Sequence, residues 1–569
     1  MALKIVRRKH VDDSQLAPYI PDPLLRQILA SRGIRRREDI DCDIKELLHY
    51  RDLKDIDRAS KLLADAIEKG ERILVAGDYD VDGITGTAVG VRGLKALGAM
   101  MVDYFVPSRY DGGYGLSVNV VEKYAELGVS LILTVDNGIS CNEAIARAKE
   151  LGLTVVVTDH HETLNELPAA DAIVDPKRKD DLFESKALCG ASVCFYLLIA
   201  VRAELSSRNY FKKKNLKRPD IANLLDLVAI GTVGDVVPFD TNNRRLIKAG
   251  IRRIRKGVCQ VGIFALIEFC KLRLSTFDVQ NISFDLCPRL NAAGRIKIEG
   301  NPAMDLLLCD DSSRAYELAK RLDFCNRRRG DFERVSVEEA QKDAQKQKDR
   351  AALTLYRSSW ISGVAGLIAG RIKNQFNAPC FVFSGEGDVI SGSARSVPGF
   401  SLAEILQEID SKAPGVLLRF GGHAMAAGAS IKKENIEYFG SLFDSAARNH
   451  ISEASDQETV TDGELPSDHL CVAFARDLET LGPWGEGFPA PVFDGEFTIS
   501  EIYTVANRHL RFALSKDDGN VMNAIKFRAT INEKALMKGL KVRVLYSVGV
   551  DRYYQNDRLE VRIENIEPI

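Results

Sequence analysis

The chain has 569 residues, of which 45% are hydrophobic and 28% are charged, and its formal net charge is −2. This composition is that of an ordinary soluble globular protein, and at about 150 residues per domain the length predicts three or four domains. A net charge so close to zero does not by itself indicate a nucleic-acid-binding protein.

Features of membrane and secreted proteins are missing from the sequence. The longest apolar stretches, 191–201 and 361–370, are shorter than the about 20 residues that a membrane span needs. Residues 1–8 contain no apolar core of the kind found in a secretion signal. The eleven cysteines form no Cys-x-x-Cys pair, which favours reduced thiols over a disulfide framework or a zinc knuckle. We therefore expect a cytoplasmic protein that contacts no membrane.

In chain order, the first predicted segment is a polar N-terminal extension, 1–55, with a few short helical patterns. From 56 to 310, helices alternate with short apolar strands, which predicts an α/β domain with a doubly wound parallel sheet. The helices of this block are predicted at 53–69, 84–97, 118–127 and 142–151, and its strands at 72–77, 101–106, 131–135 and 155–158. Residues 311–350 are helix formers dense in charge, which favours a long exposed linking helix.

A second α/β domain is predicted at 351–450, followed by an acidic linker at 451–468. In the remainder, 469–569, polar and apolar residues alternate with a period of two. Strands at 509–514 and 521–527 flank a turn, and the strands 541–550 and 558–563 follow. This pattern predicts a small antiparallel, OB-like β-barrel.

Three of the predicted strands stop at acidic residues. Their ends read Asp78-Tyr79-Asp80-Val81-Asp82-Gly83, Val135-Asp136-Asn137-Gly138 and Asp159-His160-His161. The carboxyl ends of parallel strands meet in one crevice, so these side chains should converge. Because clustered carboxylates repel one another unless cations neutralise them, the pattern indicates a metal-dependent enzyme.

Three other interpretations of the first motif are weaker. Its spacing copies the start of an EF-hand, but the twelfth position is Val89, where that loop needs a bidentate Glu. A phosphate-binding P-loop would require a following Gly-Lys-Ser/Thr, which is missing. The aspartates could simply cap the next helix, although one cap would suffice where three carboxylates are present.

The adjacent pair His160-His161 is the second strong signal, since the chain has only eight histidines. A lone histidine is more often structural, but a pair beside clustered aspartates favours metal ligation, with Asp159 orienting an imidazole. Carboxylate and imidazole ligands suit Mn²⁺, with Mg²⁺ as the alternative, and the lack of thiolates argues against structural zinc. Asp235, in Gly234-Asp235-Val236, could complete a two-metal site or belong to a simple turn.

Glycine-rich segments in the second α/β block offer backbone amides to a phosphate. They are Gly392-Ser393-Ala394-Arg395-Ser396 and Gly421-Gly422-His423-Ala424-Met425-Ala426-Ala427-Gly428. Such nests bind anions, while tight packing of a strand on a helix would need the same glycines. A third segment, 363–370, more simply serves helix packing.

Arginines near amides and aromatic rings suggest contacts to a nucleic acid. Arg289 and Arg295 bracket Asn291 in a plausible phosphodiester clamp. In the loop 107–115, Arg109 stands near two tyrosines, including Tyr114, whose rings could stack on bases. Basic clusters at 35–37, 212–218, 252–256 and 327–329 are individually solvated surfaces, but together they allow a basic track beside an acidic site.

Together these motifs resemble those of the DHH/DHHA1 phosphoesterases and, within them, the bacterial single-strand-specific 5′→3′ exonucleases. The resemblance covers essentially the whole chain, including Arg289-Leu290-Asn291-Ala292-Ala293-Gly294-Arg295 and Gly482-Pro483-Trp484-Gly485-Glu486-Gly487-Phe488-Pro489. One departure is Val81, where Ala is commoner in the family.

The resemblance implies a DHH domain, a long linking helix, a DHHA1 domain that closes a cleft, and a C-terminal OB-fold. It implies that two divalent metal ions, usually Mn²⁺, are held by Asp80, Asp82, Asp136, His160 and Asp235. Catalytic neighbours that orient ligands or contact the phosphate would be Asp78, Asp159 and His161. The 5′ end of the strand would be gripped by Ser393, Arg395, Gly421, Gly422 and His423, and its backbone by Arg109, Arg289 and Arg295.

The activity implied is hydrolysis of single-stranded DNA from its 5′ end, releasing 5′-mononucleotides, in recombination and repair. Two metals about 4 Å apart can activate a water and stabilise the attacking and leaving oxygens. The family engages the single-strand-binding protein, and we expect a repair or recombination helicase as a further partner of a monomeric enzyme.

Two rival functions remain open on the sequence. A short-oligonucleotide or cyclic-dinucleotide phosphodiesterase of the same superfamily would not need the residues beyond 450. A non-catalytic replication scaffold built on the same fold would lose acidic ligands, yet every expected one is present. A pyrophosphatase would not require so long a chain.

Overall fold

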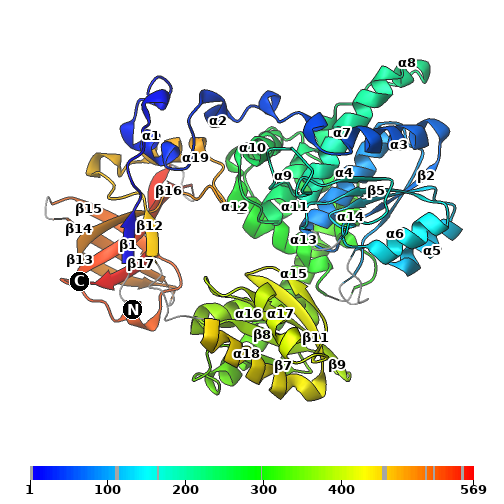
Figure 1. Cartoon of the computed structure of the whole chain (residues 1–569). Coiled ribbons are helices and arrows are strands. Elements are labelled where there is room, and N and C mark those ends of the chain that lie inside the picture. The colour runs from blue at the N-terminus through cyan, green and yellow to red at the C-terminus, as the bar shows by residue number, and fades with distance from the viewer. Residues whose placement is uncertain are drawn as a thin grey trace. The chain divides into compact units, whose positions relative to one another are not determined.

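The computed structural model describes residues 4–108, 115–162, 166–296, 298–450, 458–506, 509–516, 519–552 and 557–569. These residues group into two compact units. Figure 1 labels their helices and strands. Unit 1 comprises 1–47, 238–248 and 454–569, and unit 2 comprises 48–237 and 249–453. The chain therefore leaves unit 1 twice to build unit 2, and it returns to unit 1 at 238 and at 454.

The first sheet of unit 2 is parallel, in the order β3-β2-β4-β5-β6. Its strands are β2 (Arg72–Ala76), β3 (Met101–Phe105), β4 (Leu131–Val135), β5 (Thr154–Thr158) and β6 (Ala172–Val174). The central strands are buried on both faces, which explains their unbroken apolar sequences. The expected doubly wound parallel domain is thus confirmed.

Helices cover both faces of this sheet. Their bounds are α3 (Ile56–Lys69), α4 (Val81–Ala96), α5 (Val118–Glu126), α6 (Asn142–Glu150), α7 (Gly190–Ser207), α8 (Tyr210–Lys213) and α9 (Leu225–Gly234). α5 and α6 pack with alternate residues of β2, β4 and β5 in one core, and α4 packs against α7 and α9. Among the described residues, only α7 is long and apolar enough to cross a membrane, and 67% of it is buried inside the protein, as in a core helix.

A helical region joins the two sheets of unit 2. It contains α11 (Val261–Phe269), α12 (Val279–Asn281), α13 (Cys287–Ala293), α14 (Pro302–Leu307) and the long α15 (Ser312–Gln345). The first half of α15 packs on α11, α13 and α14, and its last turns pack on α16 (Ser362–Phe376). The middle of α15 is largely exposed.

The second sheet of unit 2 has the order β10-β11-β9-β8-β7 and is antiparallel except between β7 and β8. Its elements are β7 (Leu353–Arg357), β8 (Cys380–Ser384), β9 (Val389–Arg395), β10 (Leu417–Gly422), β11 (Ala426–Lys432), α17 (Leu402–Lys412) and α18 (Ile436–His450). One face carries an aromatic core in which Phe381 packs against Phe383, Phe439 and Phe443, with ring centroids 4.7–5.8 Å apart. The expected second α/β domain is confirmed.

Unit 1 is built around a closed five-stranded barrel, β13-β14-β15-β17-β16. Its elements are β1 (Lys4–Arg7), α1 (Pro23–Ala30), α2 (Arg37–Asp41), β12 (Glu458–Thr461), α19 (Val472–Leu481), β13 (Phe493–Val505), β14 (His509–Ser515), β15 (Val521–Lys526), α20 (Ile531–Lys534), β16 (Lys541–Asp551) and β17 (Arg558–Pro568). Helix α10 (Thr241–Arg255) begins in unit 1 and ends in unit 2.

The barrel is confirmed, with two differences from the expected pattern. β15 and β17 run parallel where they meet, so the barrel is not wholly antiparallel. The reason is that β17 runs antiparallel to β16 and lies between β16 and β15. The long β13 is not among the predicted strands. In addition, β1 pairs in parallel with β12, so the N-terminal extension contributes a strand beside the barrel.

Candidate metal centre

The turn after β2 begins the candidate site. Asp80 caps α4 by accepting hydrogen bonds from the backbone N–H groups of Asp82 and Gly83, both at 3.1 Å. The cap starts the helix at Val81, three residues before the predicted start. Asp80 is therefore a helix cap and also a member of the acidic cluster, two roles that the sequence presents as alternatives.

Asp82 is fully buried and held by the start of α7. Its two carboxylate oxygens accept hydrogen bonds from the backbone N–H groups of Gly190, at 2.5 Å, and Ala191, at 3.0 Å. The partial positive charge of a helix N-terminus favours a carboxylate at this position. A Cβ on Gly190 would lie 2.5 Å from the Cβ of Asp136, so only glycine permits this approach.

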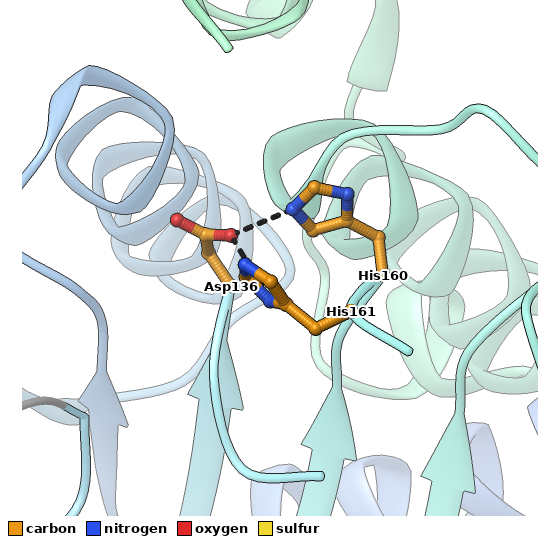
Figure 2. Close-up of side chains that lie close together, drawn as sticks. All are labelled: Asp136, His160 and His161. Carbon is orange, nitrogen blue, oxygen red and sulfur yellow. Dashed lines mark hydrogen bonds and ion pairs between the residues drawn. The ribbon is translucent and has the colours of Figure 1, made fainter. Parts of the chain in front are cut away.

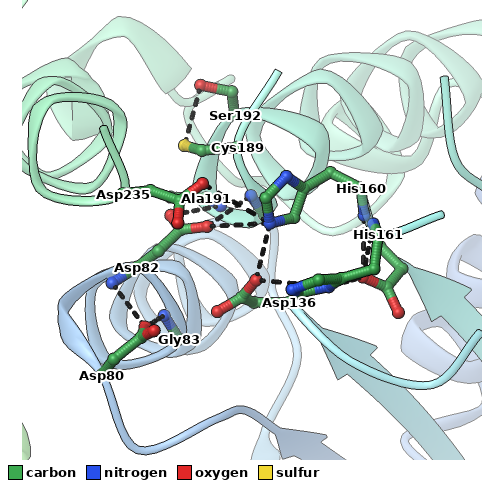
Figure 3. A network of polar contacts seen from close by, with 12 residues as sticks. Asp80, Asp82, Gly83, Asp136, His160, His161, Cys189, Ala191, Ser192 and Asp235 are labelled. Carbon is green, nitrogen blue, oxygen red and sulfur yellow. Dashed lines mark hydrogen bonds and ion pairs between the residues drawn. The ribbon is translucent and has the colours of Figure 1, made fainter. Parts of the chain in front are cut away.

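His160, after β5, lies opposite three carboxylates, of which Figure 2 shows Asp136. Its Nε2 atom is 3.0 Å from Oδ1 of Asp136, 3.5 Å from Oδ2 of Asp235 and 3.9 Å from Oδ2 of Asp82. Figure 3 shows that these side chains point toward one another. Asp136 and His160 follow β4 and β5, Asp82 lies in α4, and Asp235 follows α9. Segments distant in sequence thus form one acidic cluster.

The pair Asp159 and His161 lies beside this cluster. Asp159 accepts hydrogen bonds from the backbone N–H groups of Ile139 and His160, at 2.9 and 2.7 Å. Its Oδ1 atom is also 2.7 Å from Nδ1 of His161, which is 4.0 Å from Oδ1 of Asp136. Asp159 therefore fixes the orientation of His161 toward the cluster.

Backbone strain is concentrated at the cluster. Asp136 has φ 63°, and Val236, directly after Asp235, has φ 61°. The left-handed region is unfavourable for residues with a Cβ and most of all for a β-branched one. Strained residues of this kind persist where the surrounding structure holds functional groups in place.

The buried carboxylates of the cluster need a compensating positive charge in order to ionise. Burial and the neighbouring Asp80 raise the pKa of Asp82 to about 6. Burial and Asp82 raise the pKa of Asp235 to about 9, and the same two causes raise the pKa of Asp136 well above its usual value. Divalent cations reverse such shifts, because their charge stabilises the ionised carboxylates.

The two histidines differ in charge. Burial, followed by the charge of His161, lowers the pKa of His160 to about 3, so its imidazole is neutral and suited to ligate a metal. Burial opposes protonation of His161, but the hydrogen bond and charge of Asp159 outweigh it and raise the pKa of His161 to about 9. The same ion pair lowers the pKa of Asp159 against the effect of burial.

The donor set fits divalent metal ions. Three overlapping groups each have ligand atoms within 4.8 Å of one another: Asp136, His160 and His161; Asp82, His160 and Asp235; Asp78, Asp80 and Asp136. Among the described residues no cysteine belongs to these ligand groups. The nearby Cys189 thiol contacts the hydroxyls of Ser192 and Thr232 and is hydrogen-bonded to Asp82. Oxygen and imidazole donors without thiolates suit Mn²⁺ or Mg²⁺.

A further acidic residue, Asp175, lies at the carboxyl end of β6 and is only 1% exposed. Burial and the charge of Asp159 raise its pKa to about 7. The sequence reasoning missed it because β6 has only three residues, although Ala172-Ile173-Val174-Asp175 repeats the pattern of an apolar run that ends at an aspartate.

The predicted clamp residues are held by the protein itself. Asn291 accepts a hydrogen bond from the backbone N–H of Val81 at 3.0 Å, next to the acidic turn. Arg289 pairs with Asp323 of α15 at 2.9 Å, and Arg295 donates to the carbonyl of Gly363 at 3.2 Å. Arg109 and Tyr114 lie outside the described residues.

The predicted 5′-end residues gather on the second sheet. β11 separates β9 from β10, and its Gly428 pairs with both Ser393 and Gly421. Gly422 and Arg395 pair with the adjacent residues 427 and 426, and His423 follows at the exposed end of β10. Except for His423, these residues are parts of strands, so the predicted phosphate-binding segments lie within the sheet.

Two family models match the parts of unit 2 just described. Residues 72–232 match the DHH family, N-terminal domain, and residues 349–449 match the DHHA1 domain. The parallel sheet with its acidic centre and the second α/β domain therefore define a protein of the DHH/DHHA1 class. Residues 461–565 match the RecJ OB domain.

Relatives cover the whole chain. The chain is 38% identical over 575 residues to the single-stranded-DNA-specific exonuclease RecJ of Escherichia coli (strain K12), covering 99% of both chains. It is also 38% identical to RecJ of Haemophilus influenzae, covering 96% of both. The chain belongs to the RecJ family, which confirms the resemblance.

Solved structures agree with this assignment. The crystal structure of RecJ in complex with Mn²⁺ from Thermus thermophilus matches with a TM-score of 0.83 and 30% identity, covering 99% of this chain and 79% of that chain. The complex of the same protein with Mg²⁺ matches with a TM-score of 0.77 and 29% identity, covering 99% and 78%. Both metals expected for the cluster have thus been observed in RecJ.

Proposed function

We propose that this chain is a metal-dependent exodeoxyribonuclease that degrades single-stranded DNA from the 5′ end and releases 5′-mononucleotides. One observation carries the proposal. Asp82, Asp136, His160 and Asp235 converge on one point in a chain that is 38% identical to RecJ over 99% of its length. The chain is therefore an enzyme in which the acidic cluster is the reaction centre.

The ligands of two divalent metals, with Mn²⁺ preferred and Mg²⁺ as the alternative, are Asp80, Asp82, Asp136, His160 and Asp235. When bound, the metals supply charge neutralisation for the phosphodiester and an acidified water for in-line attack. The imidazole of His160 is neutral, and the starts of α4 and α7 hold the carboxylates of Asp80 and Asp82 in place for this role.

The remaining residues of the centre orient the reaction. Asp159 keeps His161 protonated at neutral pH, so its imidazolium can donate a hydrogen bond to a phosphate oxygen. Hydrolysis breaks the bond between phosphorus and the 3′-oxygen of the terminal nucleotide. The water oxygen stays on the phosphate, and a new 5′-phosphate remains on the shortened strand. Asp78 is placed at the same turn to support the ligands.

Strand binding is assigned to the second sheet and the barrel. Ser393, Arg395 and the 421–423 segment contact the 5′ end, while Arg109, Tyr114, Arg289, Asn291 and Arg295 contact the strand near the centre. On the barrel, Tyr503 and Phe527 are exposed, and Arg511 is paired with Tyr503 across β13 and β14. Exposed aromatic and basic side chains of this kind suit unpaired bases and phosphates.

We also infer the role of each part of the chain and the cellular context of the enzyme. Residues 56–310 form the catalytic domain, residues 311–350 link it to the next domain, and residues 351–450 close on the substrate. After a linker at 451–468, residues 469–569 extend the contact with the strand. Residues 1–55 are an N-terminal extension. The enzyme acts as a cytoplasmic monomer in recombination and repair, with single-strand-binding protein and a helicase as partners. The support is the family membership and eleven free thiols.

The test uses single-stranded DNA labelled at either end, incubated with Mn²⁺, Mg²⁺ or a chelator. We expect a 5′ label to appear at once as mononucleotide, a 3′ label to shorten progressively, and the chelator to stop both. Cleavage from the 3′ end, activity in chelator, or preference for a dinucleotide over a long strand would contradict the proposal.

A further inference from the structure

The middle of α15 carries an exposed aromatic and basic face that the reaction centre does not use. Phe324 and Phe332 are 59% and 37% exposed, and Val335 is 50% exposed. Residues 324, 328, 332 and 335 follow one another at spacings of four, four and three, which places them on one side of the helix. We call this face the α15 strip.

Arg328 lies between the two rings of the strip. Its guanidinium carbon is 5.8 Å from the ring centre of Phe324 and 5.9 Å from that of Phe332. At a rise of about 1.5 Å per residue, the rings stand about 12 Å apart along the helix. The strip therefore presents a ring, a cation and a second ring in a row.

The helical segment that carries the strip has an excess of positive charge. Residues 321–335 contain five arginines and three carboxylates. The carboxylates are already paired: Asp323 with Arg289 and Arg327, Asp331 with Arg334, and Glu333 with Arg371. Among the described residues, the contacts of Arg328 are with the two rings, so its charge stays available to an anion.

The strip is not part of the packing of α15. The buried residues of this helix include Leu322, Ala340 and Ala344, which lie on its other side, and Cys325 and Ser336, which border the strip. Exposed aromatic rings grouped on one face of a helix and rimmed by polar residues are typical of a binding surface. An apolar protein partner would have to bury Arg328 without a counter-ion, which is costly. A phosphodiester supplies the counter-ion, and its flanking bases supply flat faces for the rings.

We propose that the α15 strip is a docking surface for single-stranded DNA, with bases stacked on Phe324 and Phe332 and a phosphate bound by Arg328. This inference rests on the proposed function, since the strand docked here is the substrate. The strip would hold part of the strand that is not being cut, so it affects long substrates and spares very short ones.

The test measures strand binding in chelator, so that its result does not depend on hydrolysis. The variants are the double variant Phe324→Leu/Phe332→Leu, which keeps apolar side chains but removes the rings, and Arg328→Gln. The matched controls are Phe264→Leu, at an exposed phenylalanine of α11, and Arg334→Gln, at an arginine on another side of α15.

We expect each strip variant to weaken binding of a long single strand by about tenfold. Arg328→Gln should also reduce the salt dependence by about one phosphate contact. With Mn²⁺, the double variant should lose kcat/KM on the long strand and keep it on a trinucleotide. Because the changed side chains are exposed, melting temperatures should stay the same.

Unchanged binding by the double variant, or equal weakening by the controls, would overturn the proposal. So would a change of oligomeric state on light scattering without a change in DNA binding, because the strip would then be an interface between copies. If the unmodified protein binds the strand through the strip but cuts no DNA, the proposed function fails and the docking surface stands.

Discussion

The two sheets of unit 2 use their residues in opposite ways. In the parallel sheet, the candidate ligands stand beyond the strand ends, and Asp82, Asp136 and His160 are almost completely buried. In the second sheet, the 5′-end candidates other than His423 are parts of strands, and β10 is an exposed edge. A reaction centre needs buried groups that are held in place from several directions. A surface that binds a moving DNA strand needs exposed contacts that can form and break.

The sharpest way to test this contrast is to neutralise a buried ligand. Asp82→Asn should reduce kcat/KM by more than the about 10–100-fold that loss of a group behind a metal ligand costs. Binding of a single strand in chelator should be retained, since the second sheet and the barrel are unchanged. Single-turnover hydrolysis and equilibrium binding measure the two effects, and an active Asp82→Asn enzyme would support a scaffold role for the cluster.

Asp159→Asn removes a charge behind the centre and should have a smaller effect, about 10–100-fold in kcat. Because Asp159 raises the pKa of His161 to about 9, the variant should move the alkaline limb of the pH–rate profile to lower pH. A reduced rate with an unmoved limb would mean that the protonation of His161 is not used.

Arg395→Gln should act on binding and not on chemistry. Loss of a charge-assisted contact to the 5′ end should raise KM by about tenfold and leave kcat unchanged. Lys412→Gln, at an exposed residue of α17, is the matched control and should change neither constant. If kcat falls as far as KM rises, the second sheet belongs to the reaction centre and the contrast between the sheets disappears.

The smallest expected effect concerns stability. The pKa of Asp235 is raised in the folded state to about 9, so the metal-free fold is favoured at low pH and loses this stability as pH rises from about 4 to about 9. Mn²⁺ relieves the repulsion, so the rise in melting temperature on adding Mn²⁺ should be larger at about pH 8 than at about pH 5.5.

Asp235→Asn provides the control for that measurement. Removing the buried charge should make the melting temperature of the metal-free protein less dependent on pH. Equal stabilisation by Mn²⁺ at both pH values in the unmodified protein would contradict the assignment of Asp235 as a ligand.

The sequence predicts the parallel sheet well because its strands are short apolar runs that stop at charged residues. It predicts neither the start of α4 nor the position of Asp175 at the end of β6. The acidic motif favours a metal ligand over a helix cap at Asp80, so the start of α4 is placed too late. The strand that precedes Asp175 has three residues, which is too short to recognise.

Unit 1 is harder to predict because its order depends on distant pairing. β13 contains Asp494-Gly495-Glu496, which hides its alternation, and β1 gains its partner β12 from the other end of the chain. No local sequence pattern indicates that β1 pairs with a strand so far along the chain. The strain at Asp136 and Val236 is likewise imposed by the assembled fold.

The pairing of β1 with β12 also has a consequence for biosynthesis. Residues 4–7 cannot reach their place until residues 458–461 have been translated. At about 5–20 residues per second, the ribosome needs roughly half a minute to a minute and a half to reach that point. Throughout that interval the nascent amino-terminal strand has an unpaired edge, which makes it a natural client for a chaperone at the ribosomal exit tunnel.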